Sequence, residues 1–291
     1  MEYPSLDTAK AGAIRFNTDS SQMEIYDGNQ WTGILSSSPE LRTGGGRGVA
    51  AGGNNPAAID TIEYITISTA GNSIDFGNLT ATRQSVPGGT GSSTRGVIGG
   101  GQDGGSPTTL NIIEFITFSS TGNALDFGDL SVARRIANAA SSPTRSLIAA
   151  GYAAPASLNT IDYVTTSTLG NAADFGDTTQ ARYTAGVVSS STRAVVMGGY
   201  LSSPGAAVNT IDYVTIATLG NALDFGDLTE VIYAAQHVSD SLRGVRMGGV
   251  TPNDTTMDYV KIASTGNAVD FGNLLGRHQE GGSCSNAHGG L

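Results

Sequence analysis

A repeat of about fifty residues constrains the fold of this chain more than any other feature. The tripeptide Asp-Phe-Gly occurs five times among 291 residues, and its phenylalanines lie 46 to 51 positions apart. The aspartates and phenylalanines concerned are Asp75, Phe76, Asp126, Phe127, Asp174, Phe175, Asp224, Phe225, Asp270 and Phe271. A period of this length indicates copies of one supersecondary unit, each of which buries its apolar faces against its neighbours.

Each copy has the pattern of four short strands. In the copy that begins at Arg182, the expected strands cover residues 182–190, 194–199, 210–218 and 221–228. The third strand alternates apolar and polar residues and is followed by a Gly-Asn turn. The chain contains 41 glycines and only 14% charged residues, which suits many strands joined by tight turns. The sequence therefore predicts an all-β fold, a five-bladed β-propeller of four-stranded antiparallel blades.

Three recurring features connect the repeat to a known family. An arginine opens the first strand, a Gly-Gly pair closes the second, and a stretch like Asn-Thr-Ile-Asp-Tyr forms the third. The arginines are Arg83, Arg134, Arg182 and Arg277, and the glycine pairs begin at Gly52, Gly99, Gly198 and Gly248. In these features residues 40–291 resemble the kelch family, which implies a β-propeller. The sequence departs from the family where Phe replaces the usual Trp of the fourth strand, and where Ala149-Ala150-Gly151 replaces a glycine pair.

The two ends of the repeat array complement each other. Residues 277–286 have the pattern of a first strand, whereas the first copy begins near its second strand, at 48–53. Pairing of these two segments would close the ring and remove its exposed edges. A competing register assigns residues 39–46 to the first blade.

Residues 1–35 do not fit the repeat and are expected to form a separate N-terminal module, with the propeller over 36–291. Strand-like runs at 13–17 and 23–26 predict a β-hairpin, which is too small to be stable alone and is therefore expected to bind other chains or the propeller. The stretches Ile-Arg-Phe-Asn-Thr-Asp and Glu-Ile-Tyr-Asp-Gly resemble short modules of bacteriophage tail fibres and other virion structural proteins. This resemblance implies attachment or oligomerisation in a virus particle. The alternative is a β-cap on the propeller.

Composition disfavours several classes of partner. A net charge of −10 argues against nucleic acid, because binding to phosphates requires Lys and Arg. The single cysteine, Cys284, excludes an intrachain disulfide. The sequence contains no run of eighteen apolar residues and no signal-peptide pattern, so we expect no membrane insertion. The expected location is the virion or, without the phage resemblance, the cytoplasm.

The sequence does not indicate catalysis. Glycosidases of the propeller type need paired carboxylates near the central channel, and the predicted innermost strands offer acids only near Asp240 and Glu280. No enzyme activity, cofactor or metal is expected. The repeated aspartates are predicted to accept hydrogen bonds at turns, and the phenylalanines to fill the space between blades. A second set of arginines recurs at the entry to the second strand and either forms a positive ring for a glycan or pairs within the scaffold: Arg47, Arg95, Arg145, Arg193 and Arg243.

The loops between second and third strands differ most between copies, as expected for a binding surface on a constant scaffold. Loops without a binding role, in which sequence changes are tolerated, would show the same differences between copies. The candidate binding residues are Gln102, Asp103, Tyr152, Tyr200, Asn253 and Asp254. The predicted function is a non-enzymatic virion structural protein, such as a tail fibre or capsid decoration, within an assembly. Residues 1–35 would contact other virion proteins, and the propeller would contact a protein or a host-surface glycan. The alternatives are a soluble kelch-like interaction module and a carbohydrate-active propeller enzyme.

Overall fold

The chain consists of antiparallel β-sheets. The computed structural model describes residues 10–17, 22–33, 46–54, 56–67, 69–86, 89–104, 108–250 and 255–278. Every regular element in these ranges is a strand, which confirms the all-β prediction. None of these residues belongs to a helix that could cross a membrane. The chain divides into two compact units, Met1–Arg42 and Thr43–Leu291.

The N-terminal unit contains a three-stranded sheet in the order β1 (Ile14–Asn17), β2 (Gln22–Tyr26) and β3 (Trp31–Gly33). The predicted hairpin strands pair as β1 and β2, and a third strand follows. Asp27 turns the chain into β3, because its Oδ1 accepts the N–H groups of Asn29 and Gln30 at 2.7 and 2.8 Å. The guanidinium of Arg15 lies 4.3 Å from the ring centroid of Trp31, so β1 and β3 are also joined by side chains across β2.

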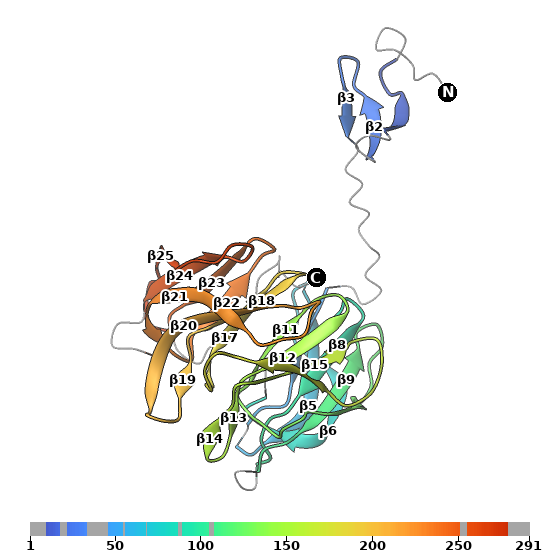
Figure 1. Ribbon diagram of the computed structural model, residues 1–291. Coiled ribbons are helices and arrows are strands. Elements are labelled where there is room, and N and C mark those ends of the chain that lie inside the picture. Colours follow the sequence, from blue (N-terminus) through green and yellow to red (C-terminus); the bar gives the residue numbers. More distant parts are fainter. Residues whose placement is uncertain are drawn as a thin grey trace. The chain divides into compact units, whose positions relative to one another are not determined.

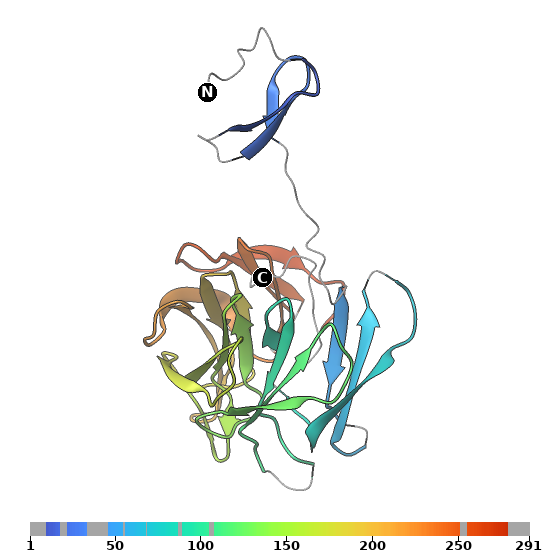
Figure 2. The same cartoon turned by 90° about the vertical axis from the view of Figure 1, so that its right-hand side faces the viewer.

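Among the described residues, the larger unit contains five main sheets, one for each copy of the repeat (Figures 1 and 2). Sheet 1 contains β4 (Arg47–Ala51), β5 (Ile59–Thr66) and β6 (Ile74–Arg83). Sheet 2 contains β7 (Thr90–Gly91), β8 (Arg95–Gly99), β9 (Ile112–Thr117) and β10 (Leu125–Asp129). Sheet 3 contains β11 (Asn138–Ser141), β12 (Arg145–Ala149), β15 (Thr160–Thr165) and β16 (Ala173–Asp177).

Sheets 4 and 5 repeat this pattern. Sheet 4 contains β17 (Gly186–Ser189), β18 (Arg193–Met197), β20 (Ala206–Thr215) and β21 (Leu223–Ile232), and the short β19 (Tyr200–Leu201) also pairs with β20. Sheet 5 contains β22 (Gln236–Ser239), β23 (Arg243–Met247), β24 (Thr256–Lys261) and β25 (Val269–Asn273). The hairpin of β13 (Tyr152–Ala153) and β14 (Ala156–Ser157) lies between β12 and β15. Blue to red in Figure 2, the five sheets follow one another around the unit.

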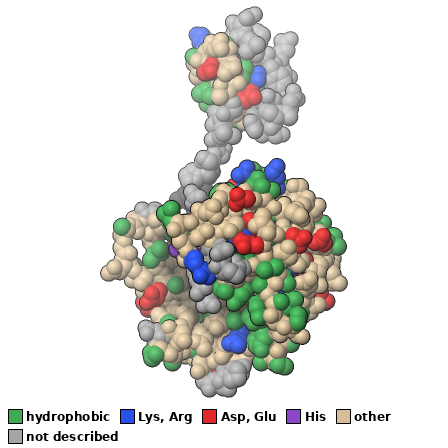
Figure 3. Space-filling model, turned by 90° about the vertical axis from the view of Figure 1, so that its left-hand side faces the viewer, with side chains coloured by type: hydrophobic (Ala, Val, Ile, Leu, Met, Phe, Trp, Pro, Cys, Tyr) green, Lys and Arg blue, Asp and Glu red, His purple; other side chains and the backbone are tan. Residues whose placement is uncertain are grey.

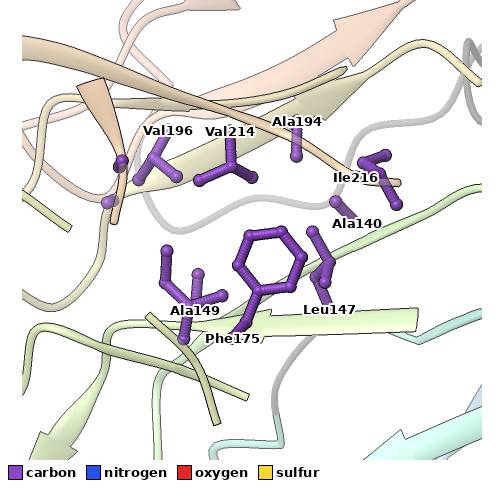
Figure 4. Close-up of a cluster of buried hydrophobic side chains, with 11 residues drawn as sticks. Ala140, Leu147, Ala149, Phe175, Ala194, Val196, Val214 and Ile216 are labelled. Atoms are coloured by element: carbon purple, nitrogen blue, oxygen red, sulfur yellow. The ribbon is translucent and has the colours of Figure 1, made fainter. Parts of the chain in front are cut away.

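The hydrophobic core lies between successive sheets. In the described part of the chain four apolar clusters occur, each built from two neighbouring sheets. Phe175 points from sheet 3 toward Val196 and Val214 of sheet 4 (Figure 4). Its counterparts Phe76, Phe127 and Phe225 are buried in the same way, with 2 to 3% of their surface exposed. Phe271 of sheet 5 differs, since 50% of its surface is exposed.

Each neighbouring pair of sheets is also joined by a backbone clasp. The Gly-Asn turn of one sheet docks on the Phe-Gly-Asp stretch of the sheet before it, or on Phe76-Gly77-Asn78 in sheet 1. The amide of Gly220 donates to the carbonyl of Phe175 at 2.8 Å, and the side chain of Asn221 accepts the amide of Asp177 at 3.0 Å. A Cβ atom on Gly176 would lie 2.5 Å from the carbonyl oxygen of Gly220, so only glycine permits this approach.

The clasp recurs at all four junctions between successive sheets. The corresponding amide-to-carbonyl bonds are Gly122 to Phe76, Gly170 to Phe127, Gly220 to Phe175 and Gly266 to Phe225. The Asp-Phe-Gly and Gly-Asn motifs are therefore the two halves of one interface, contributed by different sheets.

A buried ion pair involves the third strand of each of sheets 2 to 5. The first three pairs join an arginine that precedes the first strand to an acid on the third: Arg83–Glu114, Arg134–Asp162 and Arg182–Asp212. In sheet 5, Ile232 takes the position of that arginine, and Arg246 on β23 reaches Asp258 instead. All of these charged side chains are fully buried, and the arginines also donate to backbone carbonyls, as burial of charge requires.

The backbone register corrects two details of the predicted repeat. The amide of Gly249 donates to the carbonyl of His278, as that of Gly151 does to Arg182, so His278 rather than Arg277 corresponds to the buried arginines. The glycine pair of the second copy is Gly100-Gly101 rather than Gly99-Gly100, because those two residues have the positive φ values of 75° and 112° that the other pairs share.

Candidate binding surface

Two backbone positions associated with each of sheets 2 to 5 build a candidate binding surface. Position A directly follows the buried arginine or Ile232, and position B directly follows the second glycine. The two positions form an antiparallel bridge, as between Tyr183 and Tyr200, which exchange N–H···O bonds of 3.0 and 2.8 Å. The equivalent bridges are Gln84 with Gln102, Arg135 with Tyr152, and Tyr233 with Val250. The residue after position A has a φ of 50° to 53° in each case, which turns the chain into the first strand.

Side chains from these positions form a continuous row across sheets 2 to 5. The rings of Tyr152 and Tyr183 lie 5.2 Å apart between centroids, those of Tyr183 and Tyr200 5.7 Å, and those of Tyr200 and Tyr233 4.9 Å. At the other end, the guanidinium of Arg135 lies 5.3 Å from the centroid of Tyr152 and donates to Gln102 Oε1. We call these six residues the tyrosine row.

The fold itself does not require tyrosine at these positions. The same bridge is formed with glutamine at both positions in sheet 2, and with valine at position B in sheet 5. The shared backbone therefore does not determine which side chain occupies these positions, and the four adjacent tyrosines are not needed for folding. All six side chains are partly buried, so each ring packs against its neighbours and still reaches solvent.

The chemistry of the row is polar but almost uncharged. Burial raises the pKa of Tyr183 above its ordinary value of 10, and the nearby phenols of Tyr200, Tyr152 and Tyr233 raise it further. The hydroxyl of Tyr183 therefore stays protonated at neutral pH, where it can donate and accept hydrogen bonds. With one guanidinium and four aromatic rings, the row suits a ligand that presents both apolar ring faces and hydroxyl groups.

The row contains three of the six binding residues that the sequence predicts. Gln102, Tyr152 and Tyr200 belong to it. Asp103 is exposed beside it, and its amide donates to the carbonyl of Thr108. Asn253 and Asp254 lie outside the described residues.

The remaining three members were not predicted: Arg135, Tyr183 and Tyr233. They lie in the first-strand segment, whereas the prediction considered only the loops between second and third strands, which differ most between copies. The sequence does show which residue directly follows each of the buried arginines. That this residue belongs to a binding surface can be inferred only when its bridge to position B is known.

The repeated aspartates lie at the surface. Asp75, Asp126, Asp174, Asp224 and Asp270 are all exposed on the fourth strands. Asp174 accepts the amide of Gly176, and Asp270 that of Gly272, each at 3.1 Å. These carboxylates stabilise the bulge at the following glycine.

The arginines at the entry to the second strand belong to the scaffold. Each guanidinium lies 4.4 to 5.0 Å from the centroid of an aromatic ring in its own sheet. Four of them also donate to a backbone carbonyl of the next sheet, as Arg193 does to Ile262 at 3.1 Å: the other three are Arg47, Arg95 and Arg145. Of the two readings of these arginines, the geometry favours pairing within the scaffold over a positive ring for a glycan.

The first strands of the described sheets provide no acid pair. The four first strands β7, β11, β17 and β22 carry no Asp or Glu. Asp240 follows β22 and accepts the amides of Arg243 and Leu242, which lower its pKa and keep it ionised. Glu280 lies outside the described residues, which include no group of three or more His, Cys, Asp or Glu arranged to hold a metal.

Comparison of the chain with models of known protein families and with curated proteins found no match. The resemblances to kelch repeats and to bacteriophage tail-fibre modules therefore stay predictions.

Proposed function

We propose that the larger unit is a five-bladed β-propeller and that each of the five sheets is one blade. Support comes from the clasp, which joins each sheet to the next by the same hydrogen bonds. Support also comes from the first strands, since β7 lies beside β11, β11 beside β17, and β17 beside β22, as the innermost strands of adjacent blades do.

We further propose that this propeller is a non-enzymatic binding protein whose tyrosine row contacts a glycan of the host surface. The row itself is the observation that carries this proposal. Tyrosine supplies a large, rigid contact area with a polar tip at small cost in conformational entropy, which is why it dominates many recognition surfaces. Sugar rings offer apolar C–H faces to the aromatic rings and hydroxyls to the phenols. A protein partner that uses the same row is the competing outcome.

The N-terminal unit, in this proposal, attaches the propeller to a virus particle. Its small three-stranded sheet exposes the apolar side chains of Ile14, Met23 and Ile25, which a partner would cover, and its sequence resembles modules of virion structural proteins. The protein would thus be a tail fibre, a capsid decoration or a similar appendage that carries a binding domain.

A glycan array probed with the full chain and two variants tests the binding function. The variant Y183S/Y200S removes two central rings of the row, and L169S/L219S is a matched control that changes two exposed leucines in the turns after β15 and β20. We expect the wild type and the control to bind the same glycans, and the row variant to bind at least about tenfold more weakly, as loss of buried aromatic contacts predicts.

Equal binding by both variants would place the glycan site elsewhere. A silent array together with tyrosine-dependent capture of a particle or host protein would favour the protein partner. Immunogold labelling of purified particles, with particles that lack the chain as control, tests the attachment role. Intact wild-type particles that contain none of the chain would refute that role.

A further inference from the structure

Sheet 5 exposes the apolar face that the preceding sheets pack against the next sheet. In sheet 4 this face consists of six side chains covered by sheet 5: Val188, Val195, Met197, Ile211, Phe225 and Leu228. At the same repeat positions of sheet 5 stand Val238, Val245, Met247, Met257, Phe271 and Leu274, and every one of them is partly or largely exposed. A view from the side where β25 and β21 lie in Figure 1 shows hydrophobic side chains at the surface (Figure 3). Such a continuous apolar face indicates an interface.

Sheet 1 exposes the opposite face of the same repeat. Ile65 and Ile67 are 46 and 67% exposed, whereas their counterparts Val214 and Ile216 in sheet 4 are buried against sheet 3. Ala50 is exposed as well, although Val196 at its position is buried. The two end sheets therefore present complementary apolar halves.

The polar halves of the clasp are present at the same two ends. Sheet 5 contains Phe271-Gly272-Asn273, and sheet 1 contains Gly71-Asn72. Gly272 has the positive φ of 133° that the clasp glycines share, and an added Cβ there would meet only the end of Met257 at 3.8 Å. Space for the turn of another sheet is thus available at Gly272.

Two charged groups at the ends extend the match. Arg243 is exposed, whereas each of its four counterparts donates to a backbone carbonyl of the next sheet. In sheet 1, the carbonyl at the equivalent acceptor position belongs to Ile67. Glu63 is exposed on β5, where Glu114, Asp162, Asp212 and Asp258 are buried beside arginine in the other sheets. His278 follows β25 at the position of the buried arginines, so docking of the two ends would bring an imidazole toward Glu63.

We infer that sheet 5 binds sheet 1 of the same chain through a fifth copy of the clasp. The repeat itself identifies the partner of sheet 5. Sheets 2, 3, 4 and 5 each present one apolar face to the sheet before them, and a face of this kind would fit sheet 5. Among the described residues, sheet 1 alone still exposes that face. The inference rests on the proposed propeller architecture and is independent of any ligand.

Cysteine cross-linking in the full chain tests this interface. The variant N72C/N273C, in a C284S background, places thiols at the two clasp positions of the inferred junction. The variant N78C/N123C places them at the equivalent positions between sheets 1 and 2, where the side chain of Asn123 accepts the amide of Asn78 at 3.1 Å. Both pairs replace asparagines, so the second is a matched positive control. Each single-cysteine variant serves as the negative control.

Mild oxidation of dilute protein, followed by mass spectrometry and non-reducing electrophoresis, should show an intramolecular disulfide in both double variants at rates within about threefold of each other. Disulfide-linked dimers of N72C/N273C at a dilution where the control stays monomeric would overturn the inference in favour of a second copy. Absence of a bond while the control pair forms one would also overturn it. Glycan binding is measured on separate samples, so failure of the junction and failure of the tyrosine row give different results.

Discussion

Replacing Arg182 by isoleucine removes the guanidinium that neutralises Asp212 inside sheet 4. Both side chains are fully buried, their closest N···O distance is 2.6 Å, and Arg182 also donates to the carbonyl of Thr210 at 3.0 Å. Loss of one partner of a buried pair leaves an uncompensated charge and costs about 3 to 5 kcal/mol. For a domain of this size that corresponds to a fall in melting temperature of roughly 6 to 20 °C.

Sheet 5 shows how this loss can be reversed. There Arg246 stands directly opposite Asp258 on the neighbouring strand, and isoleucine occupies the position equivalent to Arg182. In sheet 4, Val196 stands directly opposite Asp212. The double variant R182I/V196R therefore moves the guanidinium of sheet 4 to the position that it has in sheet 5.

We expect the double variant to recover at least half of the stability that R182I loses, although the valine contacts of the core are given up. V196R alone should be destabilising, because it adds a second buried guanidinium beside the first. Urea unfolding monitored by circular dichroism, applied to both single variants and the double variant, measures the coupling, which should exceed about 2 kcal/mol. A double variant as unstable as the sum of the single changes would refute the reasoning.

Three further predictions follow from single positions. Ala150 has a φ of 59° where other copies carry glycine, so A150G should raise stability by about 1 kcal/mol in urea unfolding, and an unchanged or lower midpoint would count against the strain. G176A pushes a methyl group against the carbonyl of Gly220 and should cost about 2 kcal/mol or more, whereas G276A, with open space around it, should cost far less. Burial lowers the pKa of His237 to about 4, and because the unfolded chain binds this proton near pH 6.5, stability should fall by roughly 3 kcal/mol as the pH drops from 6.5 to 4. In H237Q that part of the pH dependence should disappear from melting curves, and an identical pH profile in both proteins would contradict the assignment.

Local patterns allowed most strands to be predicted. In the copy after Arg182, the alternation of apolar and polar residues and the Gly-Asn turn are properties of neighbouring residues. β17 and β18 fall within one residue of the predicted spans, whereas β20 begins four residues earlier and β21 ends four residues later than predicted. The reason for glycine in Asp-Phe-Gly is different, since the close contact comes from a turn about 44 residues later, as with Gly176 and Gly220. No local pattern contains that information.

The candidate site was only partly predictable for the same reason. Tyr200 follows a recognisable glycine pair at the start of a variable loop, so it was found. Tyr183 lies in a weakly patterned strand, and its relation to Tyr200 depends on a bridge between segments that are far apart in the sequence. The exchange between Ile232 and Arg246 was missed as well, because only the pairing of β23 with β24 places Arg246 opposite Asp258.

In the proposed propeller, one interface is repeated around the larger unit and joins all five sheets. Amide hydrogen exchange, followed by NMR on the unmodified chain at a concentration where it is monomeric, tests this most directly at Gly71. Its counterparts Gly122, Gly170, Gly220 and Gly266 donate to the phenylalanine carbonyl of the preceding sheet at 2.7 to 2.8 Å. We expect the Gly71 amide to be protected from exchange to a degree comparable to these four amides. Exchange of Gly71 at the rate of an unstructured amide, while the other four stay protected, would contradict it.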